Sequence, residues 1–215
     1  MKKDKSKNTG NPVRGRINAW MFHLLDGYSH YLYSNRKRKL FGELPLTLVE
    51  IGPGAGANIR YLQQKSQLIA IEPNEYMYRR LQNKAEKYNI DLEIKPNMAE
   101  RIDLESNSVE AVISTLTLCT IADNKKALNE IKRILKPGGK FFFLEHVGAK
   151  KGSLLRGIQK LVHRPWFWFF EGCHTHKDIA QGIGEAGFSE VHMEDFNMYS
   201  PFVPITPQIS GYAVK

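Results

Sequence analysis

Short apolar runs alternate with longer stretches of helical periodicity along most of the chain. The β-rich runs are 46–52, 67–72, 91–95, 109–115 and 140–147, and helical candidates fill 56–65, 74–88 and 123–136. Apolar residues follow one another without alternation in LIAI, AVIS and FFFL, which is typical of strands covered on both faces by helices. The pattern therefore predicts an α/β fold with a Rossmann-like, doubly wound, mostly parallel sheet.

The last third of the chain extends this pattern and then interrupts it. Residues 191–196 and 209–215 are strand-like, which brings the expected sheet to seven strands, and 179–187 has a helical pattern. Glycines and the aromatic run 165–170 break the alternation over 148–173, which we interpret as a lid over the substrate. The helix over 123–136 should stop at Lys136-Pro137-Gly138-Gly139, because proline cannot continue it.

The chain before residue 44 differs from the rest. Apolar residues recur at helical spacing over 17–28, which predicts an amphipathic helix, and 30–41 is expected to form a second one. Residues 1–12 are lysine-rich and lack apolar periodicity, which favours a disordered basic tail. We thus divide the chain into this tail, a helical arm over 13–43 and one main domain over 44–215.

Charge and composition narrow the function classes. The first forty residues carry ten Lys and Arg against two acids, so they hold eight of the nine net positive charges. A nucleic-acid enzyme would spread basic residues over its catalytic surface, so we expect no nucleic-acid partner, whereas the basic arm allows peripheral contact with a membrane. Two cysteines and no apolar run long enough to span a bilayer predict a cytoplasmic protein.

A glycine-rich turn follows the first strand of the main domain. Its residues, Glu50-Ile51-Gly52-Pro53-Gly54-Ala55-Gly56, allow the backbone to approach a ligand closely, and Glu72 ends the next strand. An acid there can accept hydrogen bonds from both ribose hydroxyls of an adenosine group. A nicotinamide-dependent oxidoreductase shares these two features, so they do not decide the cofactor.

Further motifs separate the two cofactor classes. The acid Glu50 two residues before the first glycine, MAE at 98–100, SVEAVIS at 108–114 and LKPGG at 135–139 resemble the motif series of class I S-adenosylmethionine (SAM) methyltransferases. The resemblance implies SAM as cofactor and S-adenosylhomocysteine as product. It further implies that the Gly52–Gly56 turn holds the methionine part, Glu72 the ribose and the Met98-Ala99 region the adenine, and that Thr115 to Thr117, including Leu116, border the methyl group. Glu50, Pro53 and Pro73 are also expected to bind the cofactor.

From Asn35 onward the chain looks like the methyltransferase-like-seven family of alkyl thiol methyltransferases and its bacterial relatives. The segments that carry this resemblance include TLTLCTI (115–121), FFLEHV (142–147), EGCHTHKDI (171–179) and PQISGYAVK (207–215). Two departures from this family are that the apolar membrane anchor of its mammalian members is not found in this sequence and that Glu72 replaces the usual Asp. Pro53, which removes a backbone N–H from the turn, departs from the wider class I pattern. The resemblance implies transfer of a methyl group to a small molecule; a thiol, an amine or an aromatic, indole-type compound all fit.

Methyl transfer requires an acceptor held in line with the methyl group and shielded from water, and a base helps when the acceptor must lose a proton. The expected bases are His146 and Glu145, at the end of the fifth strand, where open α/β sheets place ligands. His146 has an alternative role as a buried structural histidine. We expect Trp20, Tyr28, Trp166, Trp168 and His174 to line the acceptor pocket.

Other interpretations remain open on sequence grounds. Cys173, His174 and His176 lack enough neighbouring ligands for a metal site, so we expect no metal. The same chain could instead methylate lipid head groups at a membrane surface, or bind SAM without catalysis.

Overall fold

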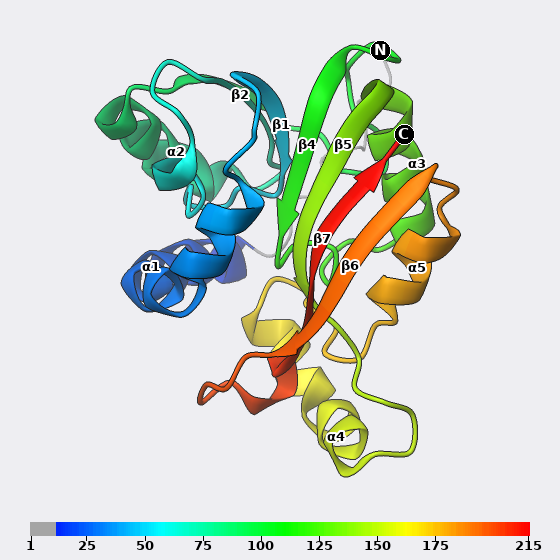
Figure 1. Cartoon of the computed structure of the whole chain (residues 1–215). Helices are drawn as coiled ribbons and strands as arrows, with labels where there is room; N and C mark the ends of the chain where they lie inside the picture. The colour runs from blue at the N-terminus through cyan, green and yellow to red at the C-terminus, as the bar shows by residue number, and fades with distance from the viewer. Residues whose placement is uncertain (1–11) are drawn as a thin grey trace, which may run out of the picture.

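A computed structural model describes residues 12–215 of the chain, and the predicted tail over 1–12 lies almost wholly outside these residues. Figure 1 shows a central twisted sheet with helices on both faces. Within the described residues the sheet has seven strands in the order β3-β2-β1-β4-β5-β7-β6. The predicted α/β class and the strand count are therefore confirmed.

Within the described residues, six strands run in one direction and one strand runs opposite to them. The first five, each parallel to its neighbours, are β1 (Thr47–Ile51), β2 (Gln67–Ile71), β3 (Asp91–Lys95), β4 (Val109–Thr115) and β5 (Leu135–His146). The reversed strand is β7 (Pro207–Val214), which lies between β5 and β6 (Glu190–Asn197) and is antiparallel to both, so β6 runs in the same direction as β5. The strand order changes direction at β1, because β2 and β3 lie on one side of it and β4 on the other. Ligands of open α/β sheets bind at such a point.

Successive side chains of each central strand enter opposite hydrophobic layers. In β5, Phe141 and Phe143 are buried among residues of α3 (Asn124–Ile134) and α5 (Ile179–Glu185). Phe142 points to the other face, where α2 (Glu75–Tyr88), the 3₁₀ helix η1 (Ile59–Tyr61) and Phe41 cover the sheet. This two-sided burial explains the continuous apolar runs that the strands share.

Two helical predictions are wrong in detail. Residues 56–65 form turns and only the short η1, and the predicted helices over 17–28 and 30–41 are one helix, α1 (Pro12–Leu40). The expected apolar stripe of α1 is partly exposed, since Trp20 and Leu24 are each 58% exposed. Among the described residues, no helix has the length and apolar character needed to cross a membrane.

The helix stop at Lys136–Gly139 also differs from its prediction. The helix α3 ends earlier, at Ile134, and β5 begins at once with Leu135 paired to Val109. The next pair joins Ala111 of β4 to Lys140 of β5. Residues 136–139 of β5 therefore have a single counterpart position in β4 and bulge out of the ladder. The proline and glycines of this segment thus form a bulge in β5 and do not end α3.

The predicted lid contains a helix of its own. After β5 the chain forms α4 (Leu154–Phe169), whose first turn is capped by Ser153 accepting a hydrogen bond from the Arg156 N–H. A second 3₁₀ helix, η2 (Val203–Ile205), precedes β7. Figure 1 places α1 and α4 at the end of the sheet where β4 and β5 finish, so both lie at the edge expected to bind ligands.

Candidate active site

The turn after β1 is shaped by two glycines with different surroundings. Gly52 and Gly54 both have positive φ, 62° and 56°. A Cβ on Gly52 would lie 2.4 Å from the Cγ2 atom of Thr117, whereas no atom lies within 4 Å of one on Gly54. Gly52 is thus required by packing against Thr117, while Gly54 borders space that a ligand can fill.

Glu72 follows β2, and its carboxylate holds the glycine turn after β1 in place. Its carboxylate accepts hydrogen bonds from the backbone N–H of Gly54, at 3.0 Å, and of Asn74, at 2.8 Å. The side chain is 4% exposed, and burial raises its pKa to about 7, although both hydrogen bonds oppose that shift. A buried carboxylate with lone pairs to spare suits neutral hydroxyl donors such as those of a ribose.

Glu50 is the second buried acid of the site. Its Oε1 accepts a 2.6 Å hydrogen bond from the Asn58 side chain, which also donates to the Thr115 hydroxyl at 2.8 Å. No described residue donates to Glu50 Oε2. Burial raises the pKa of Glu50 to about 7, and burial lowers that of the nearby Lys37 to about 8. An unpartnered buried oxygen fits a cationic donor, such as the ammonium group of a bound amino acid.

The other predicted cofactor residues lie along the same edge. Pro53 is buried in the glycine turn and Pro73 is exposed beside Glu72. Met98 is 37% exposed and Ala99 is buried, in the connection after β3. The backbone of Leu116, just beyond Thr115 of β4, has a φ of 54° and donates its N–H to Leu144. The structure therefore brings all of these residues to the carboxyl ends of four adjacent strands.

Glu145 is tied to the loop that follows β4. It is completely buried, and its carboxylate accepts hydrogen bonds from the Ser114 hydroxyl at 2.7 Å and from the N–H groups of Thr117 and Leu118 at 3.2 Å. Burial raises its pKa to about 7 against the effect of these bonds. Thr117 in turn donates its hydroxyl to Gly52. Glu145 thus fixes the loop against the glycine turn, and its predicted catalytic role stays a prediction.

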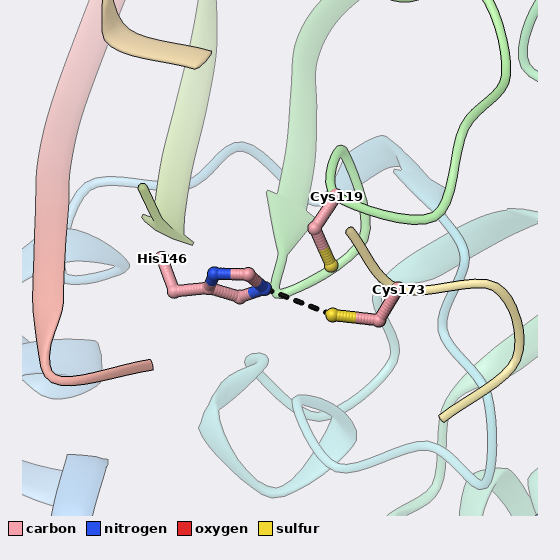
Figure 2. Close-up of side chains that lie close together, drawn as sticks. All are labelled: Cys119, His146 and Cys173. Atoms are coloured by element: carbon pink, nitrogen blue, oxygen red, sulfur yellow. Dashed lines mark hydrogen bonds between the residues drawn. The ribbon is translucent and has the colours of Figure 1, made fainter. Parts of the chain in front are cut away.

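His146 contacts a cysteine rather than open space. Its Nε2 lies 3.1 Å from the Sγ of Cys173, which also accepts a 3.2 Å hydrogen bond from the Trp166 indole N–H. Figure 2 shows Cys119 approaching the same point from the loop after β4. All three residues are buried. We could not predict this cluster from sequence, because its members are separated by 27 residues or more.

The predicted acceptor residues fall into two groups. Tyr28 and Trp166 both lie against Phe202, with ring centroids 6.4 and 6.1 Å away, and Trp166 stacks on Phe170. His174 instead stacks on His163 of α4, with centroids 4.9 Å apart. Trp20 and Trp168 are 58% and 48% exposed. Only Tyr28 and Trp166 therefore share one aromatic cluster, formed by α1, α4 and the connection before β7.

One groove of the described surface lies away from these residues. A groove of about 470 Å³ lies between Glu43, Glu110 and the bulge at Lys136–Gly139. These residues lie where β4 and β5 begin, at the opposite edge of the sheet from the glycine turn. The groove holds none of the predicted site residues, so it does not bear on the chemistry above.

Known proteins match this arrangement in sequence and in fold. Residues 49–143 match a family described as a methyltransferase domain. Thiol S-methyltransferase TMT1B of Rattus norvegicus is 30% identical, over 95% of this chain and 88% of the relative. Thiol S-methyltransferase TMT1A of Homo sapiens is also 30% identical, over 85% of this chain and 79% of the relative. The chain belongs to the TMT1 thiol S-methyltransferase family.

Solved structures agree with this membership at the level of fold. A SAM-dependent methyltransferase from Thermotoga maritima, described as a possible histamine N-methyltransferase, has a TM-score of 0.66 at 20% identity over 95% of this chain and 98% of its own. A SAM-dependent methyltransferase from Aquifex aeolicus gives 0.63 at 19% identity with the same coverage. This TMT1 family member is therefore a methyltransferase, its cofactor is SAM, and its acceptor is a small molecule.

Proposed function

We propose that the protein transfers the methyl group of SAM to a small-molecule thiol. The observation that carries this proposal is the extent of the match to named thiol S-methyltransferases, which spans 85–95% of the chain. The match therefore includes α4 and the segments before β7, which form the acceptor side, as well as the shared SAM-binding strands. In sequence, relatives with another named activity match a smaller part: the ubiquinone/menaquinone biosynthesis C-methyltransferases of Rickettsia typhi and Rickettsia prowazekii match 58% and 73% of this chain.

The residues around the glycine turn would hold the cofactor. The free Oε2 of Glu50 would accept from the amino group, and Glu72 would accept from the ribose hydroxyls while it keeps Gly54 and Asn74 in place. The space above Gly54 would take the methionine part, and Met98 and Ala99 would border the adenine. When bound, SAM supplies an electrophilic methyl group on a positively charged sulfur.

The protein's own contribution to the reaction is positioning and exclusion of water. The Glu145 carboxylate holds the loop at Thr117, so the groups beside Gly52 have one fixed arrangement. Helices α1 and α4 contact each other over this edge, and Asn74 donates from the end of β2 to Glu171 beyond α4. These contacts would enclose the acceptor and keep water away from the reacting sulfur.

A thiol needs little help from a base. A thiol as acidic as a cysteine side chain, with a pKa of about 8.5, is a few per cent thiolate at neutral pH, and the thiolate is the nucleophile. The acceptor sulfur forms a bond to the methyl carbon as the sulfonium bond breaks, and the thiol proton passes to solvent. Nε2 of His146 is hydrogen-bonded to Cys173, and Nδ1 has no hydrogen-bond partner among the described residues. General-base catalysis by His146 stays a prediction.

A panel of acceptors that differ only in the reacting atom tests the proposal. Butanethiol, butanol and butylamine share one carbon skeleton, and thiophenol, phenol and aniline repeat the comparison with an aromatic ring. We expect S-adenosylhomocysteine to form with the thiols at least tenfold faster than with their oxygen and nitrogen counterparts. Preference for an amine or alcohol would reject the thiol assignment but keep the methyltransferase, and product from none of them, with SAM bound, would argue against both acceptor series.

We also propose that the helices α1 and α4 contact a membrane surface peripherally. Large apolar side chains on them are exposed, with Tyr31 at 79% and Leu161 at 83%, and the basic residues of the arm would attract anionic lipid. Cosedimentation with phosphatidylserine vesicles tests this. Binding that is weakened in a Tyr31→Ser, Leu161→Ser double variant would support the proposal, whereas no cosedimentation of the parent protein at low salt would reject it.

A further inference from the structure

Three side chains that can ligate a metal meet at the carboxyl edge of the sheet, and they come from three separate segments. Cys119 lies in the loop after β4, His146 ends β5, and Cys173 lies between α4 and α5. Figure 2 shows the two sulfur atoms and the imidazole directed toward one another. Their ligand atoms all lie within 4.8 Å of one another, with 3.1 Å between His146 Nε2 and Cys173 Sγ.

These distances fit one tetrahedral ion. Zinc binds cysteine sulfur at about 2.3 Å and histidine nitrogen at about 2.0 Å, which places neighbouring ligand atoms roughly 3.5 to 3.8 Å apart. The shortest separation lies below these values and the longest is no more than about 1 Å above them, so side-chain rotations that move the ligand atoms by up to about 1 Å would be enough. Two thiolates and one imidazole also form a ligand set that selects zinc over magnesium or calcium.

The surroundings of the cluster suit a bound zinc ion. The Trp166 indole N–H donates to Cys173 Sγ, as outer groups commonly do around metal-bound thiolates. Two thiolates would neutralise the charge of the ion, so the buried site needs no further counter-ion. Within the described residues, no other Cys, His, Asp or Glu joins the cluster, so a water would complete the tetrahedron.

We propose that Cys119, His146 and Cys173 bind one zinc ion, which clamps the α4 lid to the sheet. The ion would join the loop after β4, the end of β5 and the segment after α4, whose mutual contacts otherwise depend on packing and single hydrogen bonds such as His174 N–H to Cys119 O. This proposal is independent of the acceptor, because it concerns how the lid is held and not which atom is methylated.

Metal analysis of the whole chain tests the proposal directly. Protein purified without chelators, or stripped and then titrated with zinc under reducing conditions, should contain one zinc per chain. Cobalt(II) in its place should give the intense visible bands of a tetrahedral ion and a near-ultraviolet thiolate-to-cobalt band. A parent protein that takes up less than a tenth of an equivalent of zinc, or whose cobalt spectrum lacks the thiolate band, overturns the proposal whatever the variants do.

Matched variants locate the ion. Cys119→Ser, Cys173→Ser and His146→Gln should each lose most of the bound zinc, with circular dichroism used to confirm that they fold. His163→Gln serves as the control, because His163 stacks on His174 and meets the His176 ring edge-on just outside the cluster. If His163→Gln loses the ion while Cys119→Ser keeps it, the metal binds at the histidines and the proposed site is rejected.

The melting temperature provides a second readout that tests the clamp. A ligand bound only by the folded state at a hundred times its Kd should raise the Tm of a chain this size by roughly 5 to 10 °C. We expect that rise for the metal-free parent protein and none for Cys119→Ser. Zinc binding without any rise in Tm would reject the clamp.

Discussion

The two halves of the carboxyl edge are built in opposite ways. On the SAM side, acids are buried: Glu72 accepts hydrogen bonds from the N–H groups of Gly54 and Asn74, and Glu50 keeps one oxygen without a partner among the described residues. On the side where we propose that the acceptor binds, here called the acceptor side, apolar groups are exposed, and Trp20, Leu24 and Trp168 each show about half of their surface or more. The SAM side is part of the sheet itself, whereas the acceptor side consists of helices added at its edge.

This difference predicts which substitutions disturb the fold and which the fold tolerates. A residue in the glycine turn has backbone and side chains on most sides, so its substitution disturbs both the fold and the cofactor. An exposed residue of α1 or α4 has few neighbours, so its substitution should change the stability of the fold little and affect only the molecules that contact that residue. Variants on the two sides should therefore separate stability, SAM affinity and acceptor turnover.

Gly52→Val should have the largest effect. The left-handed φ of 62° and a Cβ only 2.4 Å from Thr117 together should cost about 3 kcal/mol or more in the free energy of unfolding, with loss of SAM binding. Gly54→Ala is the matched control, because its φ is similar but its surroundings are open; it should cost only about 1 kcal/mol. Urea unfolding measures both, and equal losses would show that packing against Thr117 does not distinguish the glycines.

Glu72→Gln should weaken SAM binding without unfolding the protein. The amide keeps the shape but replaces one acceptor oxygen by a donor, so the charged hydrogen bonds to Gly54, Asn74 and the ribose are lost or weakened. We expect the Kd for SAM to rise roughly 10- to 100-fold in calorimetric titration. The control Glu110→Gln alters an exposed acid at the opposite edge, and an equal rise in both variants would contradict a specific role for Glu72.

The affinity for SAM should depend on pH through the same carboxyl group. Burial raises the pKa of Glu72 from 4.5 to about 7 in the cofactor-free protein, while ribose binding requires the ionised form. At pH 6 about a tenth of the group is ionised, so the apparent Kd should be roughly tenfold higher than at pH 8. Glu72→Gln should flatten this dependence, and an equally steep profile in that variant would assign the titration to another group.

The same shift predicts how the stability of the SAM-free protein changes with pH. Because the folded pKa of Glu72 lies above the unfolded value, the fold binds the proton more tightly and gains stability from it below about pH 4.5. That contribution is lost as the pH rises from 4.5 through about 7. Glu50 and Glu145, whose pKa values burial also raises to about 7, act in the same direction. Denaturant midpoints of the parent protein and Glu72→Gln, compared at pH 5 and pH 8, measure the difference.

Trp20→Ala should have the smallest effect on fold and cofactor. With 58% of its surface exposed, the side chain contributes little to stability, so the free energy of unfolding should change by less than about 0.5 kcal/mol. We expect SAM affinity to stay unchanged and the KM for the acceptor to rise. Trp166→Ala is the comparison on the same side, because Trp166 packs on the main core and bonds Cys173. An unchanged acceptor KM in Trp20→Ala would remove Trp20 from the acceptor side.

The sequence predicted best what short segments determine. The strands β1 to β4 and the helix at Glu75–Tyr88 follow from local apolar runs and periodicity and match their predicted ranges closely, whereas β5 begins five residues before its predicted start. The edge with Gly52 and Glu72 follows from topology, because parallel strands bring their ends together. Residues 56–65 failed as a helix because Gly56 and Asn58 serve the turn and the Glu50 side chain instead.

Longer-range features were beyond prediction. The meeting of Cys119, His146 and Cys173 depends on where the segment after α4 returns to the sheet, and no periodicity encodes that return. The bulge at Lys136–Gly139 depends on the pairing partner Val109 rather than on proline and glycine alone. Lys37 is 3% exposed, although it lies in the basic last turn of α1, and its Nζ is 5.7 Å from the centre of the Tyr61 ring, which is distant in sequence.

The position of β7 also determines the order in which this fold can be completed. During synthesis β6 emerges first, yet it joins the sheet only through β7, which inserts between it and β5. Until residues 207–214 leave the ribosome, the hydrogen-bonding edge of β5 stays open and β6 has no partner in the sheet. A nascent chain stalled before that point presents an exposed strand edge, which is where chaperones would bind and where aggregation would begin.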